Sequence, residues 1–175
     1  DQLMADGAVS DEALKKAESF IEEEEGAANH LAGALGLFVT LAAVLMSVFH
    51  LYAAYSIVPT QTLRPVHVAM VLFASFLCFP IARRYRNRVM WWDWLMAALS
   101  VAVVVYMLMG GDDFTDRNTS PERLDIVFGV ALILLIMEAM RRSNGWVMPI
   151  ITSLFILYAF AGPWLPAPWT HKGYE

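Results

Sequence analysis

Residues 31–57 read LAGALGLFVTLAAVLMSVFHLYAAYSI, a run of 27 residues without Asp, Glu, Lys or Arg. An α-helix rises about 1.5 Å per residue, so this run would be about 40 Å long and would cross a hydrocarbon core of about 30 Å with some tilt. Small residues, among them Gly33 and Gly36, lie along it and favour close contact with another helix. The stretch therefore predicts a tilted membrane-spanning helix that packs closely on a neighbour.

Four further apolar runs follow along the chain. They cover residues 65–82, where Pro65 suits a first helical turn, then 94–109, 126–140 and 146–165. Over all 175 residues, 58% are apolar and 17% charged, whereas soluble domains average about 45–50% and about 25%. We expect an all-α integral membrane protein with four to five transmembrane helices. Four transmembrane helices are expected if residues 126–165 cross the membrane only once and the rest of that segment lies at the interface.

The positions of Lys and Arg predict the orientation. A cytosolic N-terminus puts eight of these residues on the inner side and four on the outer side, as the positive-inside rule favours. A cluster of inner arginines lies beside a helix end, where it suits anionic lipid headgroups: Arg83, Arg84, Arg86 and Arg88. Trp91 and Trp92 follow at the expected headgroup level. The N-terminus is therefore predicted inside and the C-terminus outside.

The first 30 residues form an acidic tail. Nine of the seventeen acids precede residue 26. Ser10 suits a helix N-cap, and Asp11 and Glu12 suit the positive start of a helix. We expect a short N-terminal amphipathic helix from Ser10 to about residue 25, lying near the membrane or on a partner. A solvated charged tail is an equally good interpretation.

Glu138 is the acidic side chain placed within an apolar run, and an acid inside a membrane is by default a functional candidate. Arg141 and Arg142 follow at three and four positions, so both cations lie on its face of the helix. We expect a local ion pair near the cytosolic interface; the alternative is a proton or substrate site. The first three runs contain no carboxylate, so the chain is not expected to run an ion-coupled transport cycle alone.

Two histidines suggest a different chemistry. His50 and His67 lie toward the outer ends of the first and second runs, where two imidazoles could ligate a haem between neighbouring helices. The simpler interpretation is a pair of interfacial, hydrogen-bonded histidines. The sequence has no hydrolase or phosphate-cradling motif, no Cys/His spacing typical of a metal site and no basic surface interleaved with aromatics. No enzymatic activity, metal or nucleic acid is therefore expected.

Several strings, in order along the chain, are similar to one transporter family. The most specific is MEAMRRSNGW at 137–146, continued by MPII at 148–151 and FILYAFAGP at 155–163. Shorter ones are HLY at 50–52, DWL at 93–95, LDIVFG at 124–129 and HKGY at 171–174. Together they resemble the N-terminal part of the fused membrane subunit of TRAP (tripartite ATP-independent periplasmic) transporters, of the TAXI type. The resemblance covers about residues 31–175.

The resemblance implies a small Q-like scaffold that precedes a large M-type region holding the substrate and sodium sites. It divides the chain into the acidic tail (1–30), a four-helix Q-like scaffold (31–142), and a fifth membrane helix and linker toward an M-type region (143–175). The implied system is a secondary-active symporter of a prokaryotic inner membrane that imports small organic anions. No cofactor is expected in this chain, because the sodium or proton that drives uptake would bind in the M-type region.

The implied partners are the M-type transport subunit, as a separate chain or a continuation of this one, a periplasmic substrate-binding protein and membrane lipids. In the family's elevator-type scheme the substrate rides in the M-type partner while this chain anchors the immobile scaffold. The positioning residues would be the four clustered arginines, Trp91, Trp92, Glu138, Arg141 and Arg142. Candidates for docking the binding protein, mostly from the outer loop at 110–125, are Arg64, Asp112, Asp113 and Asp116.

Two other classes of protein are also consistent with the sequence. One is a haem-binding membrane anchor of an oxidoreductase, with His50 and His67 as ligands. The other is a stand-alone membrane assembly protein, which would be stable without a partner chain.

Overall fold

The computed structural model describes residues 10–25 and 28–172, apart from the side chains of residues 21–25 and 83. Within these residues the regular elements are all helical. They are α1 (Asp11–Glu25), α2 (Gly33–Tyr55), α3 (Thr60–Cys78), α4 (Trp91–Asp116), α5 (Arg123–Asn144) and α6 (Val147–Ala161), with 3-10 turns at Arg83–Tyr85, Arg117–Thr119 and Gly162–Trp164. The expected all-α class is confirmed.

In the part of the chain that the structure describes, four helices are long and apolar enough to cross a membrane: α2, α3, α4 with the turn that follows it, and α6 with its own following turn. The 23 residues of α2 give a length of about 34 Å. Large apolar side chains cover these helices, such as Leu45, 63% exposed, and Phe155, 69% exposed. So much exposed apolar surface belongs in lipid rather than in water. The chain is a multi-pass membrane protein.

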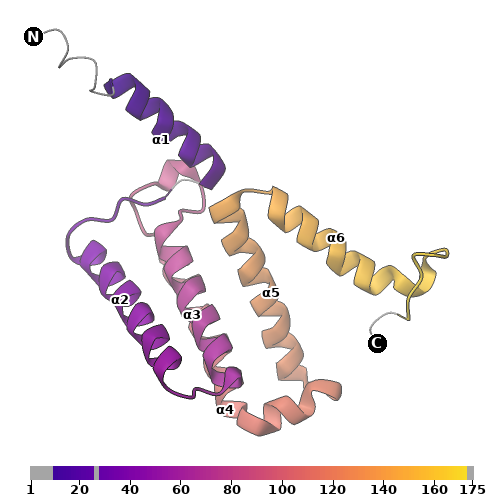
Figure 1. Cartoon of the computed structure of the whole chain (residues 1–175). Coiled ribbons are helices and arrows are strands. Elements are labelled where there is room, and N and C mark those ends of the chain that lie inside the picture. Colours follow the sequence, from indigo (N-terminus) through magenta and orange to yellow (C-terminus); the bar gives the residue numbers. More distant parts are fainter. Residues whose placement is uncertain (1–9, 26–27, 173–175) are drawn as a thin grey trace, which may run out of the picture.

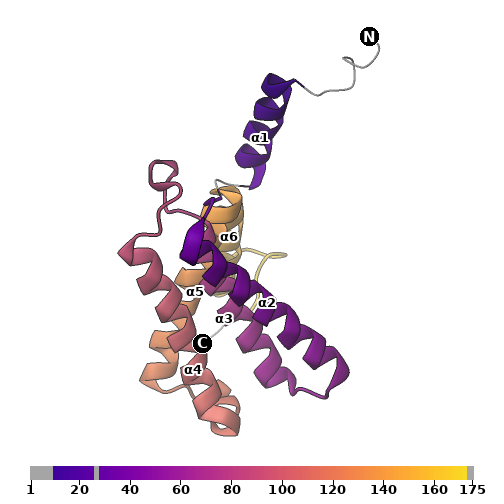
Figure 2. The same ribbon diagram turned by 90° about the vertical axis from the view of Figure 1, so that its left-hand side faces the viewer.

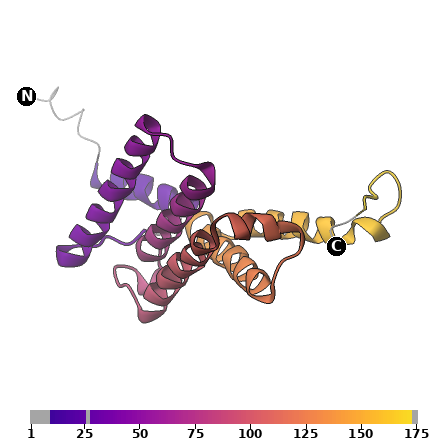
Figure 3. The same ribbon diagram turned by 90° about the horizontal axis from the view of Figure 1, so that it is seen from below.

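The helices α2 to α5 form a bundle, and α6 turns away from it after Gly145 (Figures 1 and 3). α3 is the central helix, in contact with α2, α4 and α5. The core lies where α3, α4 and α5 meet, and its buried residues are Leu72, Phe76, Ala97, Val103, Leu135 and Ala139. α2 lies against α3 and has no buried residue of its own. α1 projects from the end of the bundle where α5 ends (Figures 1 and 2).

Helix boundaries differ from the sequence-based expectation at several places. α3 begins at Thr60, so Pro65 lies inside the helix rather than in its first turn; because it lacks an N–H, the carbonyl of Gln61 loses its usual partner. The segment expected as an acidic outer loop is partly helical. Gly111, at φ 50° and ψ −131°, breaks α4, and Asp112 begins a further helical turn.

α5 is longer than the apolar run that predicted it, since it spans 22 residues. Its ends carry Arg123 and Asp125 at one side and Glu138, Arg141 and Arg142 at the other. These charges keep α5 out of the four candidate spans in the described residues, although it packs in the bundle beside α3 and α4. Two capping contacts start it: the Glu122 carboxylate and the Asp125 carboxylate accept backbone N–H bonds reciprocally.

Candidate functional site

Four charged side chains meet at the end of the bundle where α5 finishes: Asp93, Glu138, Arg141 and Arg142, here called the Arg142 cluster. The Arg142 side chain is fully buried and donates from Nη1 to Asp93 Oδ1 at 2.6 Å and from Nε to Glu138 Oε1 at 2.8 Å. Arg141 donates to both carboxylate oxygens of Glu138 at 2.7 Å. The ion pair predicted for Glu138 is therefore present, with both arginines.

The cluster also satisfies backbone groups left open at the end of α3. Arg142 Nη1 donates to the carbonyl of Phe79 at 3.1 Å, and Arg141 Nη2 donates to the carbonyl of Ile81 at 3.1 Å. Carbonyls at the end of a helix lack partners within it, so the guanidinium groups replace partners that lipid cannot supply. The cluster thus connects the end of α3, the start of α4 and the end of α5.

Local sequence explains why each charge lies where it does. Asp93 is in the first turn of α4, near the positive end of the helix dipole, and its Oδ2 accepts the backbone N–H of Met90 at 2.9 Å. Arg141 and Arg142 are in the last turn of α5, near its negative end. Two carboxylates and two guanidiniums make the cluster neutral, and each carboxylate is engaged by an arginine. The chemistry of this arrangement is structural, since no carboxylate here is left to exchange with a ligand.

Asp93 is the member of the cluster that the sequence analysis did not single out. Its side chain is 2% exposed. The sequence contained a signal in its charges: at the end of α5 two arginines follow a single acid, so one of the two cations needs a further anion. Asp93 is the acid at the start of a neighbouring apolar run. The predicted orientation puts the start of α4 and the end of α5 on the same side of the membrane, but it does not predict that Asp93 and Arg142 are in contact.

The loop between α3 and α4 is tied to the segment before α2. The Asn29 side chain donates to the carbonyl of Leu77 at 3.0 Å and accepts the backbone N–H of Asn87 at 2.8 Å. The Asn87 side chain in turn accepts the backbone N–H of His30 at 2.8 Å. Asn87 has φ 64°, a left-handed conformation that Asn tolerates better than most residues. This reciprocal pair, which nothing in the sequence pattern indicated, positions the start of α2.

The clustered arginines predicted to face lipid headgroups lie in this same loop. Arg84 stacks on the ring of Tyr85 at 4.6 Å, and Arg86 is 2.9 Å from the ring nitrogen of His30. Arg88 is exposed, and the side chain of Arg83 lies outside the described residues. Trp91 is 69% exposed, whereas the neighbouring Trp92 packs on Tyr85 with ring centroids 5.4 Å apart. The structure gathers these residues at the end of the bundle that holds the Arg142 cluster.

A second polar contact joins α4 to α5 at the opposite end of the bundle. The Tyr106 hydroxyl donates to Asp125 Oδ1 at 2.7 Å, and its ring stacks on Phe128 at 4.3 Å. Arg117 donates to the same carboxylate oxygen at 3.3 Å and lies 3.7 Å from Glu122. The Tyr106 hydroxyl, together with the backbone N–H of Glu122, holds the pKa of Asp125 below its ordinary value.

The residues predicted to dock a binding protein lie at this second end. The side chains of Arg64, Asp112, Asp113 and Asp116 are all exposed. Arg64 and Asp112 line the same hollow, between the start of α3 and the end of α4. The other two acids do not line it.

His50 and His67 contact each other directly. The Nε2 atom of His50 is 2.8 Å from Nδ1 of His67, and Nδ1 of His50 is 2.7 Å from the carbonyl of Met46. That carbonyl requires a proton on His50 Nδ1, so with both rings neutral His67 is the donor between them. A metal ion between two imidazole nitrogens needs two bonds of about 2 Å each. The pair is too close to hold one in this arrangement, and its two nitrogens bond each other instead.

The fold and these contacts define a class: a multi-pass helical membrane protein whose described charged and hydrogen-bonding clusters lie at the ends of its bundle. No model of a known protein family matches the chain. Comparisons with curated proteins and with solved structures found no match either.

Proposed function

We propose that this chain is the Q-like scaffold of a TRAP transporter of the TAXI type, which anchors an M-type transport region during uptake of small organic anions driven by a sodium or proton gradient. The resemblance of residues 31–175 suggests the family. The observation that carries the scaffold role is the distribution of charge. The Arg142 cluster ties α3, α4 and α5 at one end, and the Tyr106–Asp125 contact ties α4 to α5 at the other.

The middle of the bundle supports the same role. Between the two polar ends the helices meet through Leu72, Val103 and Leu135, all at most 5% exposed. A packed apolar interior resists relative movement of its helices. A carrier of ions or organic anions instead needs polar groups or broken helices near the middle of the membrane. The described part of the chain therefore suits a scaffold that stays fixed while the M-type transport region moves.

The exposed apolar faces are where an M-type partner would pack. α6 departs from the bundle (Figure 3) and exposes large side chains on several sides, among them Ile150, Phe155 and Phe160. In this proposal α6 leads toward the M-type region, and the Arg64 end of the bundle faces the periplasmic binding protein. The orientation follows the positive-inside prediction, with the N-terminus in the cytoplasm.

Co-purification tests the proposed partners. The chain would be tagged in its native cells, solubilised gently, and the proteins that accompany it identified by mass spectrometry. We expect a large polytopic chain, or a continuation of this one, together with a periplasmic solute-binding protein. Recovery with redox subunits and a coloured cofactor would overturn the proposal in favour of the haem anchor. Recovery as a stable homo-oligomer alone would favour the assembly protein.

An uptake assay tests the proposed scaffold role. Deleting the segment should abolish binding-protein-dependent uptake in native cells, and supplying residues 1–175 as a separate chain should restore it. The rescue arm separates loss of the scaffold from damage to the rest of the operon or chain. Uptake that persists at the parental rate after deletion would refute the scaffold role.

A further inference from the structure

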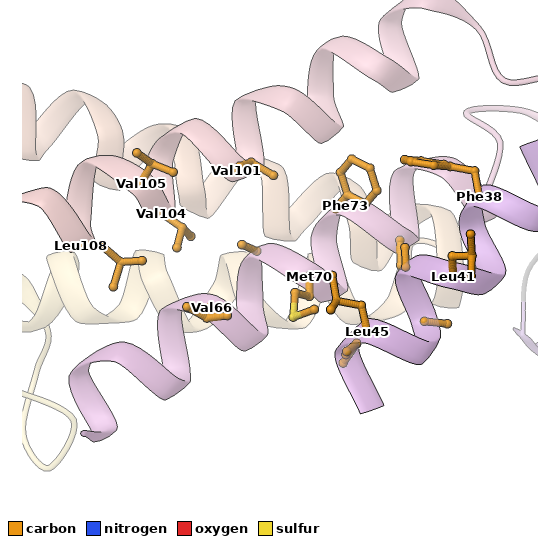
Figure 4. A pocket seen from close by; sticks show the side chains of 15 residues that line it. Phe38, Leu41, Leu45, Val66, Met70, Phe73, Val101, Val104, Val105 and Leu108 are labelled. Atoms are coloured by element: carbon orange, nitrogen blue, oxygen red, sulfur yellow. The ribbon is translucent and has the colours of Figure 1, made fainter. Parts of the chain in front are cut away.

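An apolar groove runs along the bundle between α2 and α4. α3 forms its floor. Side chains from all three helices line the groove, for example Leu41 of α2, Met70 of α3 and Val104 of α4 (Figure 4). Its volume is about 650 Å³. Within the described residues the backbones of α2 and α4 are not in contact, which leaves the groove open along one side.

Aromatic residues close one end of the groove. The ring of Phe38 lies 6.1 Å from that of Phe73 and 5.9 Å from that of Trp94, centroid to centroid. Phe38 belongs to α2 and Trp94 to α4, so this contact bridges the two walls. The groove therefore ends at the level of Trp94, toward the Arg142 cluster.

A polar hollow, here called the mouth, lies beside the other end of the groove. Leu108 lines both the groove and the mouth, so the two are adjacent. The mouth has a volume of about 440 Å³ and includes the side chains of Arg64, Asp112 and Thr115. The break of α4 at Gly111, which also lines the mouth, sets Asp112 there. One cation and one anion thus stand beside one end of the apolar groove.

The lining of the groove limits what can fill it. The groove follows α2 from Phe38 to Met46, and all of its lining side chains are apolar, so it suits a hydrocarbon chain or the apolar face of a helix. The charged side chains of Arg64 and Asp112 beside one end favour the lipid, because a lipid carries a polar headgroup at the end of its hydrocarbon chains.

We propose that the groove and its mouth bind one phospholipid with a primary ammonium headgroup, as in phosphatidylethanolamine. An acyl chain lies in the groove and ends at the Phe38–Trp94 contact. Arg64 binds the phosphate, because its planar guanidinium donates two parallel bonds to phosphate oxygens. Asp112 accepts hydrogen bonds from the ammonium, which a quaternary choline group cannot donate. The paired charges of the mouth match the paired charges of this headgroup.

Fluorescence quenching of Trp94 measures occupancy of the closed end. The purified, delipidated full chain in detergent would be titrated with phosphatidylethanolamine carrying brominated acyl chains, and the signal of a Trp94→Phe variant subtracted. We expect saturable quenching, with brominated phosphatidylcholine binding several-fold more weakly. Arg64→Gln should weaken binding about tenfold, since it removes a charge-assisted contact. Asp112→Asn should abolish the preference for the ammonium lipid.

Matched controls isolate the site. Ala43 lines the groove, so Ala43→Leu should fill it and remove the saturable signal. Ala54→Leu places the same side chain elsewhere on exposed α2 surface and should leave binding unchanged. Arg123→Gln and Asp113→Asn make the same changes at exposed positions outside the mouth. They are the controls for Arg64→Gln and Asp112→Asn and should leave lipid binding unchanged. Each variant would first be required to melt at the wild-type temperature, so that lost binding is not lost folding.

Three results would overturn the proposal. Non-saturable quenching that is equal for all lipids and variants would mean that the groove meets only the surrounding lipid. Competition by inorganic phosphate as effective as that by the phospholipid would reduce the site to a free-anion site at Arg64. A polypeptide that co-purifies and blocks the quenching would make the occupant a helix of a partner protein.

Discussion

Replacing Asp93 by Ala tests whether the Arg142 cluster holds the bundle together. Asp93 supplies one of the two carboxylates that face the fully buried Arg142 side chain. It also caps α4 through the N–H of Met90. The substitution leaves a buried guanidinium with Glu138 as its remaining anion, and Glu138 is shared with Arg141.

The expected cost follows from these contacts. Removing one partner of a buried ion pair costs about 3–5 kcal/mol, and losing a helix cap about 1 kcal/mol. Because Glu138 remains, we take the lower end of the first range and expect a loss of about 4 kcal/mol in the free energy of unfolding. Asp93→Asn keeps an oxygen for the Met90 N–H, so it should retain the cap and lose only the charge.

The double variant Asp93→Leu with Arg142→Leu gives the sharper result. It removes one anion and one cation together, so Glu138 and Arg141 remain as a neutral pair. Apolar replacement of a buried ion pair is often nearly neutral, so the double variant should be more stable than Asp93→Ala. A double-mutant cycle with the single variants Asp93→Leu and Arg142→Leu would then report a favourable coupling of at least about 2–3 kcal/mol between the two side chains.

The assay can use Cys78, the only cysteine of the chain, which is partly buried at the end of α3. Its reaction with a fluorogenic maleimide during a denaturant titration in detergent reports exposure of that helix end. Asp113→Ala, at an exposed position, is the control and should change stability by no more than about 0.5 kcal/mol. A loss below about 1 kcal/mol for Asp93→Ala, or a double variant as unstable as the sum of its singles, would show that the Arg142 cluster does not hold the bundle together.

Three further outcomes are expected. The Tyr106 hydroxyl is the main cause of the lowered pKa of Asp125, so the Asp125 carboxylate contributes stability at neutral pH that is lost as the pH falls through the folded-state pKa. The difference in melting temperature between the wild type and Asp125→Asn should therefore shrink from pH 7 to about pH 3. A constant difference would contradict this. Asn29→Ala leaves the Asn87 N–H and a carbonyl without partners and should cost about 1–3 kcal/mol in the same unfolding assay, against no change for the exposed Asn118→Ala. Absorption spectra of the purified chain should show no Soret band, because His50 bonds His67; a band that disappears in His50→Ala would instead establish the haem anchor.

Among the charged residues, contacts within one helix were predictable from the sequence, whereas contacts between helices were not. The spacing of Glu138, Arg141 and Arg142 predicts an ion pair, because residues three and four apart share a helix face, and the structure contains it. Asp93 lies 49 positions from Arg142 along the chain, so no local rule links them. The same holds for His50 and His67: their depth was predictable, whereas the direct contact at 2.8 Å depends on how α2 crosses α3.

By itself, the sequence determined that this chain is helical and belongs in a membrane, because apolar runs of this length can satisfy their backbone groups in lipid only as helices. It also determined where the charges lie along each helix. Tertiary structure alone decided which helix ends meet, and with them the neutral Arg142 cluster, the Asn29–Asn87 connection and the groove between α2 and α4. The reason is physical: in lipid, apolar side chains gain little by burial, so close packing and a few polar contacts between distant residues select one arrangement among many.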